Sequence, residues 1–153
     1  MKFLKALTIG ASLLALAACS SMSGNVDEEN CANATAAQIE ELETKVGDRV
    51  FFAFDSSALS AEAQETLRKQ AAFMEQNPGL IFTIEGHADE RGTREYNMAL
   101  GERRADVVAQ FLRGLGCSSK RLTVVSFGKE RPAVVGSNEW AWSQNRRTVT
   151  VAQ

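Results

Sequence analysis

The longest hydrophobic pattern in the chain lies near its middle. Apolar side chains recur there every three or four residues, the spacing of one helix face, at Tyr96, Leu100, Val107, Val108, Phe111, Leu112 and Leu115. Thr93 stands where an N-cap is expected, and Gly114 and Gly116 stand where a helix commonly ends. The pattern therefore predicts an amphipathic helix that begins near Thr93 and finishes at one of these glycines.

A second helical pattern precedes it, with apolar positions at Leu59, Ala63, Leu67 and Met74. Ser60 is a candidate N-cap, and Asn77-Pro78-Gly79 is a stop signal. Four β-prone runs cover residues 50–54, 80–85, 122–127 and 147–151. Gly86 is expected to end the second run, and the stretch between the last two is expected to be irregular. The order β-α-β-α-β-β predicts an α/β fold of the α+β sandwich type, with helices packed on a mixed four-stranded sheet.

One residue interrupts the apolar face of the longer helix. Arg104 lies four residues after Leu100 and four before Val108. A guanidinium in that position is costly unless it reaches water or meets an anion. Asp89 and Glu90 precede the helix, so we expect an internal ion pair between one of them and Arg104 when no ligand is bound.

The same segment predicts a small polar notch. Asn97 lies seven residues before Arg104, on the same side of the helix, and Gly101 between them has no side chain. With Asp89 on one wall and Arg104 on the other, the notch would suit a zwitterion. The alternative for Asp89 is that it only caps a turn.

The N-terminus has the features of a secretory signal. Lys2 and Lys5 precede an apolar run over residues 6–18 that is too short to span a bilayer. The run leads into Leu16-Ala17-Ala18-Cys19, which resembles the lipobox of bacterial lipoproteins, with Cys19 as the acylated first residue of the mature chain. The alternative is a plain signal peptide that happens to precede a cysteine. We expect a signal peptide over residues 1–18, and several acyl tails would hold the mature chain stably on a membrane.

The segment after Cys19 is polar. Residues 19–45 predict a lipidated, flexible tether in which residues 39–42 form a helical turn, and residues 46–153 predict the folded domain. Removing Lys2 and Lys5 from the 17 basic side chains leaves 15 against 19 acidic ones, a mature net charge near −4. Since counterion release needs a basic surface, nucleic acid is not expected as a partner.

Besides Cys19, the chain has Cys31 and Cys117. In an oxidising compartment these two are able to form a disulfide, closing a loop of 117 − 31 = 86 residues. A free buried thiol at Cys117 and pairing between chains remain as alternatives. No cysteine or histidine spacing predicts a metal site, and no cofactor is expected.

Four segments carry a family resemblance: FFAFDSSAL, GHADERGT with EYNMALGERRA, SFGKERPAVVG and NRRTV. From about Val50 to Val151, the chain resembles the OmpA-like C-terminal peptidoglycan-binding domain, and its leader resembles that of the lipoprotein members of this family. The resemblance implies non-covalent binding of the uncrosslinked peptidoglycan stem peptide through meso-diaminopimelate. It assigns the two ends of that amino acid to Asp89 and Arg104.

Further site residues follow from the same resemblance: Phe54, Asp55, Asn97 and Arg146. Ala53 stands where the family often has an aspartate, so any contact from that carboxylate is absent. We expect Arg147 to be a solvated or edge-strand residue. For Trp140 and Trp142 we expect core packing or a protein contact.

The resemblance also implies location and partners. Ser20 follows the acylated cysteine, and the absence of an aspartate there favours an outer membrane anchor, with the domain facing the periplasm. Lipoproteins of this family also dock the periplasmic propeller protein TolB and work with the Tol system during cell division. A protein-interaction module whose main partner is TolB is therefore the alternative function. An enzyme is not expected, because His87 is the only histidine and no nucleophile with a histidine base accompanies it.

Overall fold

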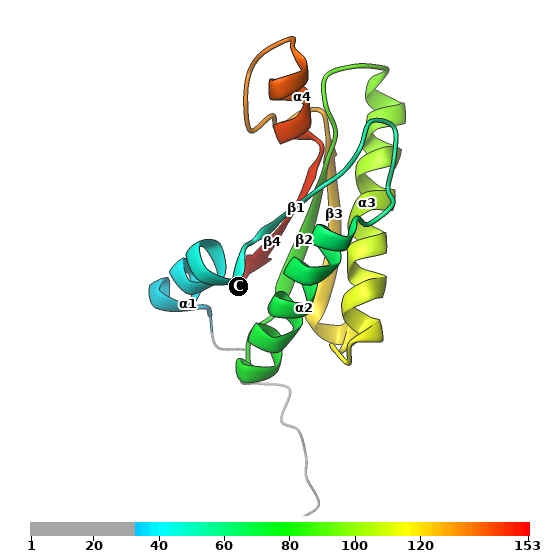
Figure 1. The fold of residues 1–153 in the computed structure, drawn as a ribbon. Coiled ribbons are helices and arrows are strands. Elements are labelled where there is room, and N and C mark those ends of the chain that lie inside the picture. The colour runs from blue at the N-terminus through cyan, green and yellow to red at the C-terminus, as the bar shows by residue number, and fades with distance from the viewer. Residues whose placement is uncertain (1–32) are drawn as a thin grey trace, which may run out of the picture.

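The computed structural model describes residues 33–153 (Figure 1). The predicted signal peptide over residues 1–18, the acylation site Cys19 and the predicted disulfide partner Cys31 lie outside the described residues. They therefore stay predictions.

The core of the fold is a four-stranded mixed sheet in the order β1-β4-β2-β3. Its strands are β1 (Arg49–Phe51), β2 (Phe82–His87), β3 (Leu122–Gly128) and β4 (Arg147–Ala152). β2 pairs parallel with β3 and antiparallel with β4, which in turn pairs antiparallel with β1. The long helices α2 (Ala61–Gln76) and α3 (Arg94–Gly114) run alongside the sheet (Figure 1). This arrangement confirms the predicted fold class.

Apolar side chains from both helices and the sheet fill the space between them. Leu67, Ile84, Val108 and Leu112 are fully inaccessible to solvent, and Phe73 and Phe82 meet edge to face with ring centroids 6.3 Å apart. Burial of such side chains is the main favourable term in folding, at about 1.5–3 kcal/mol each. The periodic positions read from the sequence therefore form the core that holds the sheet against the two helices.

Local signals place the helix ends as predicted. The Ser60 hydroxyl accepts a hydrogen bond from the Ala63 backbone N–H, and the Thr93 hydroxyl accepts one from Tyr96. α2 ends at its C-cap Asn77, and α3 ends at Gly114, followed by Gly116 in the left-handed region at φ 101°.

Two strands differ from the prediction at their ends. β1 stops at Phe51 instead of residue 54, because the chain turns at Phe54 and Asp55, where Asp55 has a φ of 51°. β2 starts later and runs through Gly86 to His87. Gly86 does not end the strand but lets the α3 backbone approach it, since a Cβ there would lie 1.9 Å from the Gly101 carbonyl oxygen.

Four helical elements of the described residues lie outside the two long helices. The predicted turn at residues 39–42 spans the end of α1 (Ala36–Glu41) and the start of a π-helical turn, η1 (Leu42–Val46). Thr35 and Gln38 form a capping box at the start of α1. Leu42 is buried in the core. A short 3₁₀ turn, η2 (Ser119–Arg121), precedes β3. The stretch expected to be irregular contains α4 (Glu139–Asn145), capped by Asn138.

Candidate functional site

A pocket of about 180 Å³ opens at one end of the sheet. The loop after β1, the loop after β2 and the first turns of α3 supply its lining: Phe54, Asp55, Asp89, Arg91, Gly92, Tyr96, Asn97, Leu100 and Arg104. Figure 1 shows the loop after β1 passing beside the N-terminal half of α3, at the end of the sheet where α4 also lies. Five of the six residues predicted for ligand binding line this pocket, and the sixth, Arg146, touches it through Asp89.

Arg104 forms the buried cationic wall of the pocket and has no solvent-exposed surface. The expected ion pair to Asp89 or Glu90 is wrong: the guanidinium instead donates to three backbone carbonyls. Nε reaches Ser56 O at 2.8 Å, Nη1 reaches His87 O at 2.8 Å and Nη2 reaches Ala53 O at 3.1 Å. The loop after β1 wraps around this side chain. The partial negative charges of the three carbonyl oxygens stabilise the buried guanidinium in place of the expected anion.

Arg104 keeps its charge in this setting. Burial lowers the pKa of its guanidinium to about 10, and the negative charge of Asp89 opposes that shift. A guanidinium has five N–H donors, and three of them are used. Two donors therefore make no hydrogen bond with the described residues.

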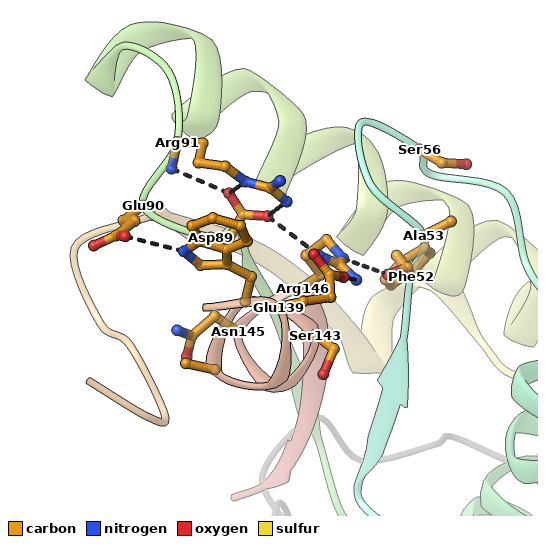
Figure 2. Close-up of polar contacts among 12 residues, drawn as sticks. Phe52, Ala53, Ser56, Asp89, Glu90, Arg91, Glu139, Ser143, Asn145 and Arg146 are labelled. Carbon is orange, nitrogen blue, oxygen red and sulfur yellow. Dashed lines mark hydrogen bonds and ion pairs between the residues drawn. The ribbon is translucent and has the colours of Figure 1, made fainter. Parts of the chain in front are cut away.

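Asp89 forms the anionic wall and is 5 % exposed. Its Oδ1 accepts from the backbone N–H and from Nε of Arg91, both at 3.1 Å, and its Oδ2 accepts from Nη2 of Arg91 at 2.7 Å (Figure 2). Burial raises the pKa of the Asp89 carboxyl, but the hydrogen bonds from Arg91 outweigh it and bring the pKa below its ordinary value. Asp89 is therefore ionised at neutral pH.

Arg146 approaches Asp89 from the opposite side, at the junction of α4 and β4. Its Nη1 lies 3.5 Å from Asp89 Oδ2, while Nε donates to Phe52 O at 3.0 Å and Nη2 to Glu139 Oε1 at 2.7 Å (Figure 2). Arg146 thus anchors the end of β1 and supports the position of the carboxylate.

Asn97 holds the loop after β2 in the shape that lines the pocket. Its side-chain amide donates to Arg91 O at 2.8 Å and to Thr93 O at 3.0 Å, and it is 2 % exposed. Gly101 does not leave the notch open as expected. It faces the sheet, where a Cβ would lie 2.4 Å from Ser126 Oγ on β3 and 2.9 Å from Gly86 O on β2, and so permits the close contact of α3 with both strands.

The aromatic rim of the pocket is exposed. The Phe54 ring is 61 % exposed and Tyr96 is 46 % exposed, although the spacing of Tyr96 assigned it to the buried face of the helix. The Tyr96 hydroxyl donates to Asp55 Oδ1, and this hydrogen bond raises the pKa of Tyr96. Asp55 thereby fixes one edge of the opening.

Sequence reasoning missed Arg91 and Trp142. The Arg91 guanidinium lies between two rings, 4.1 Å from the Phe54 centroid and 4.0 Å from that of Trp142, and Trp142 Nε1 donates to Glu90 Oε1 at 3.0 Å. Arg91 is part of the GHADERGT motif, but no spacing rule connects it with Trp142, 51 positions later. Trp140, in contrast, is 66 % exposed.

Two further residues considered in the sequence analysis lie outside the pocket lining. Arg147 is 8 % exposed and donates to Arg131 O, so the expectation of a solvated or edge-strand residue is wrong: it lies on β4, an inner strand between β1 and β2. His87 is buried and stacked on Phe127, with centroids 5.5 Å apart. Burial lowers the pKa of His87 to about 4, with Arg147 and Arg131 adding to the shift, so the imidazole is neutral.

Cys117 is half-buried, and burial raises the pKa of its thiol. Within residues 33–153, no group of three or more His, Cys, Asp or Glu side chains is arranged to hold a metal ion. None of the helices in this part of the chain has the length and apolar character needed to cross a bilayer.

Fold and site together define the class as an OmpA-like α+β domain: the profile of the OmpA family matches residues 51–146, which include the whole pocket lining. The peptidoglycan-associated lipoprotein of Brucella melitensis is 51% identical over 77% of this chain and 70% of its own length. That of Haemophilus influenzae is 40% identical over 97% of both chains. The crystal structure of the peptidoglycan-associated lipoprotein from Burkholderia pseudomallei aligns with a TM-score of 0.68 at 40% identity, covering 69% of this chain and 90% of that one. The chain therefore belongs to the OmpA family, and within it to the peptidoglycan-associated lipoproteins.

Proposed function

We propose that this protein is an outer-membrane lipoprotein that binds peptidoglycan non-covalently, by holding meso-diaminopimelate of an uncrosslinked stem peptide in the pocket. The observation that supports this most directly is the pairing of two buried, oppositely charged side chains, Asp89 and Arg104, in one small pocket. Diaminopimelate has an ammonium and a carboxylate at the free end of its side chain, which are the charges that these two walls complement.

The dimensions of the pocket favour a single amino acid. At about 180 Å³ it is smaller than the ~300–1,000 Å³ typical of sites for larger molecules. The two unused donors of Arg104 suit one carboxylate, and charge-assisted hydrogen bonds of this type contribute about 1.5–3 kcal/mol each. Phe54, Tyr96 and Leu100 offer apolar surface to the methylene chain between the charged ends.

Together, the lipid anchor and the pocket would make the protein a reversible tether between the outer membrane and the cell wall. Acylated Cys19 would hold the chain on the outer membrane, and the domain would bind the cell wall. Residues 20–32 would connect Cys19 to the first described residues. Because the proposed ligand contacts are hydrogen bonds and ion pairs, the link would form and break without making or breaking a covalent bond. The protein would thereby contribute to envelope integrity and cell division as part of the Tol-Pal system.

TolB is proposed as an additional partner on the strength of the family resemblance. A TolB surface that overlaps the peptidoglycan face would make the two partners compete. Competition is measurable: saturating stem peptide should release the protein from immobilised TolB, and simultaneous binding of both would contradict a shared surface.

Sedimentation with purified sacculi tests the binding proposal. Asp89→Asn keeps the shape of the side chain but removes its charge, so we expect loss of co-sedimentation. Glu102→Gln, an exposed position on the same helix as Arg104, is the matched control and should bind normally. Equal binding by both variants would refute the site. The absence of released muropeptides during the incubation would support a binding protein, and their release would support an enzyme.

Titration of a stem tripeptide defines the ligand. A peptide with diaminopimelate should bind more tightly than its lysine counterpart, because lysine lacks the carboxylate that Arg104 is proposed to hold. Equal affinity for the two peptides would refute the role of Arg104.

A further inference from the structure

In the structure described here, a side chain of the protein itself occupies the anionic wall of the pocket. Arg91 directs its backbone N–H, Nε and Nη2 at the two oxygens of Asp89, at 3.1, 3.1 and 2.7 Å. A carboxylate offers about four acceptor positions, two on each oxygen. Oδ1 is therefore fully used, and the remaining position on Oδ2 already faces Arg146 Nη1 at 3.5 Å. An incoming ammonium finds no free place on Asp89.

Two aromatic rings hold Arg91 in this place. Its guanidinium lies 4.1 Å from the Phe54 ring and 4.0 Å from the Trp142 ring, both within the ~6 Å range of cation–π contacts. Glu90 accepts a hydrogen bond from the Trp142 indole and so fixes that ring. The loop after β1, the loop after β2 and α4 thus meet on one side chain.

Arg91 is also the member of the pair that is free to leave. Its side chain is 30% exposed, whereas that of Asp89 is 6% exposed. A rotation into solvent would rehydrate the guanidinium in exchange for its contacts with Asp89 and the two rings, while Asp89 would stay where the backbone of its own loop holds it.

We propose that Arg91 is a displaceable counter-ion that closes the pocket: it pairs with Asp89 in the free protein and moves into solvent when a ligand ammonium takes its place. This inference rests on the proposed function and describes how that same site is regulated. Exchange of one cation for another keeps Asp89 paired at every stage. The apparent affinity is then the intrinsic affinity multiplied by the fraction of free protein in which Arg91 has already moved away from Asp89. The smaller that fraction, the weaker the observed binding.

Affinity for a diaminopimelate-containing stem tripeptide tests this exchange. Arg91→Met keeps the length of the side chain but removes the competing cation, and the dissociation constant should fall roughly fivefold or more. Arg94→Met is the matched control: it removes the same charge three residues later, from an exposed arginine paired with Glu130, and should leave the affinity nearly unchanged. If Arg91→Met binds no more tightly than Arg94→Met, Arg91 is a spectator or a ligand contact, and the inference is wrong.

Indole fluorescence gives a second, independent measurement. Trp140→Phe changes an exposed ring and leaves Trp142 as the single tryptophan. Saturating tripeptide should change the emission of Trp142, because the guanidinium leaves its ring, and adding Arg91→Met should abolish that response. A ligand-bound protein with unchanged emission would overturn the inference, as would a response that persists in the double variant.

The outcomes separate this inference from the function on which it rests. If the wild-type protein binds and Asp89→Asn does not, while Arg91→Met shows no gain, only the closing role of Arg91 fails. If neither wild type nor Arg91→Met binds the tripeptide, both proposals fail together.

Discussion

Replacement of Arg104 by methionine is the most demanding test of the site, because this residue combines a structural and a proposed binding role. Arg104→Met fills a similar volume but removes the donors that reach Ala53 O, Ser56 O and His87 O. The loop after β1 would lose the contacts that hold it against α3. Both the stability of the protein and the shape of the pocket should change.

The magnitude follows from two opposing contributions. Each buried carbonyl left without a donor costs about 1–3 kcal/mol. Against this, burial lowers the pKa of Arg104 from its ordinary value to about 10, which corresponds to a cost of about 3 kcal/mol for keeping the charge buried, and methionine would remove that cost. Three such carbonyls at the middle of that range cost about 6 kcal/mol, so we expect a net loss of about 3 kcal/mol of unfolding free energy, with each kcal/mol lowering the Tm by about 3–6 °C for a domain of this size.

Urea unfolding and sacculus sedimentation measure the two roles of Arg104 separately. Arg104→Met should unfold at lower urea and lose binding under conditions where the protein is still folded. Arg113→Met, an exposed arginine at the end of the same helix, should change neither property by much. A variant at Arg104 that is as stable as wild type and still sediments with sacculi would refute both the packing argument and the site.

Three further predictions concern the stability of the fold. The pKa of His87 is about 4 in the folded protein against 6.5 when unfolded, so between these pH values the unfolded state binds more protons. The free energy of unfolding should therefore fall by up to about 3 kcal/mol as the pH drops from 6.5 to 4. Urea midpoints across that range, compared with His87→Leu, measure the effect, and an equal slope in both proteins would contradict it. Gly86→Ala should cost more than about 3 kcal/mol of unfolding free energy or prevent folding, because its Cβ would lie 1.9 Å from Gly101 O. Gly114→Ala is the control, since nothing lies within 4 Å of a Cβ at that position. Equal melting temperatures of the two variants would refute the close contact. Thr35→Ala removes the capping box of α1 and should cost about 1 kcal/mol by urea unfolding, whereas no change would show that α1 adds nothing to the fold.

Several features of the fold were predictable because their causes are local. Ser60 and Thr93 begin α2 and α3, and Asn77 and Gly114 end them, through side-chain caps and backbone preferences that involve only neighbouring residues. Arg104 was identifiable for the same reason, since its position within an apolar face depends on helix periodicity alone. The charged pair Asp89 and Arg104 lines one pocket, as expected from the motif that contains both.

The partners of these residues depend on the tertiary structure. Arg104 meets carbonyls 17 to 51 positions away in the chain, and Asp89 meets Arg91 and, from 57 positions away, Arg146 instead of Arg104. Arg91 lies against Trp142 because α4, which no pattern indicated, brings the indole to the pocket. Spacing along a helix reveals that a buried charge needs a partner. Only the packing of distant segments decides which group supplies it, because backbone carbonyls are present at every residue and leave no mark in the sequence.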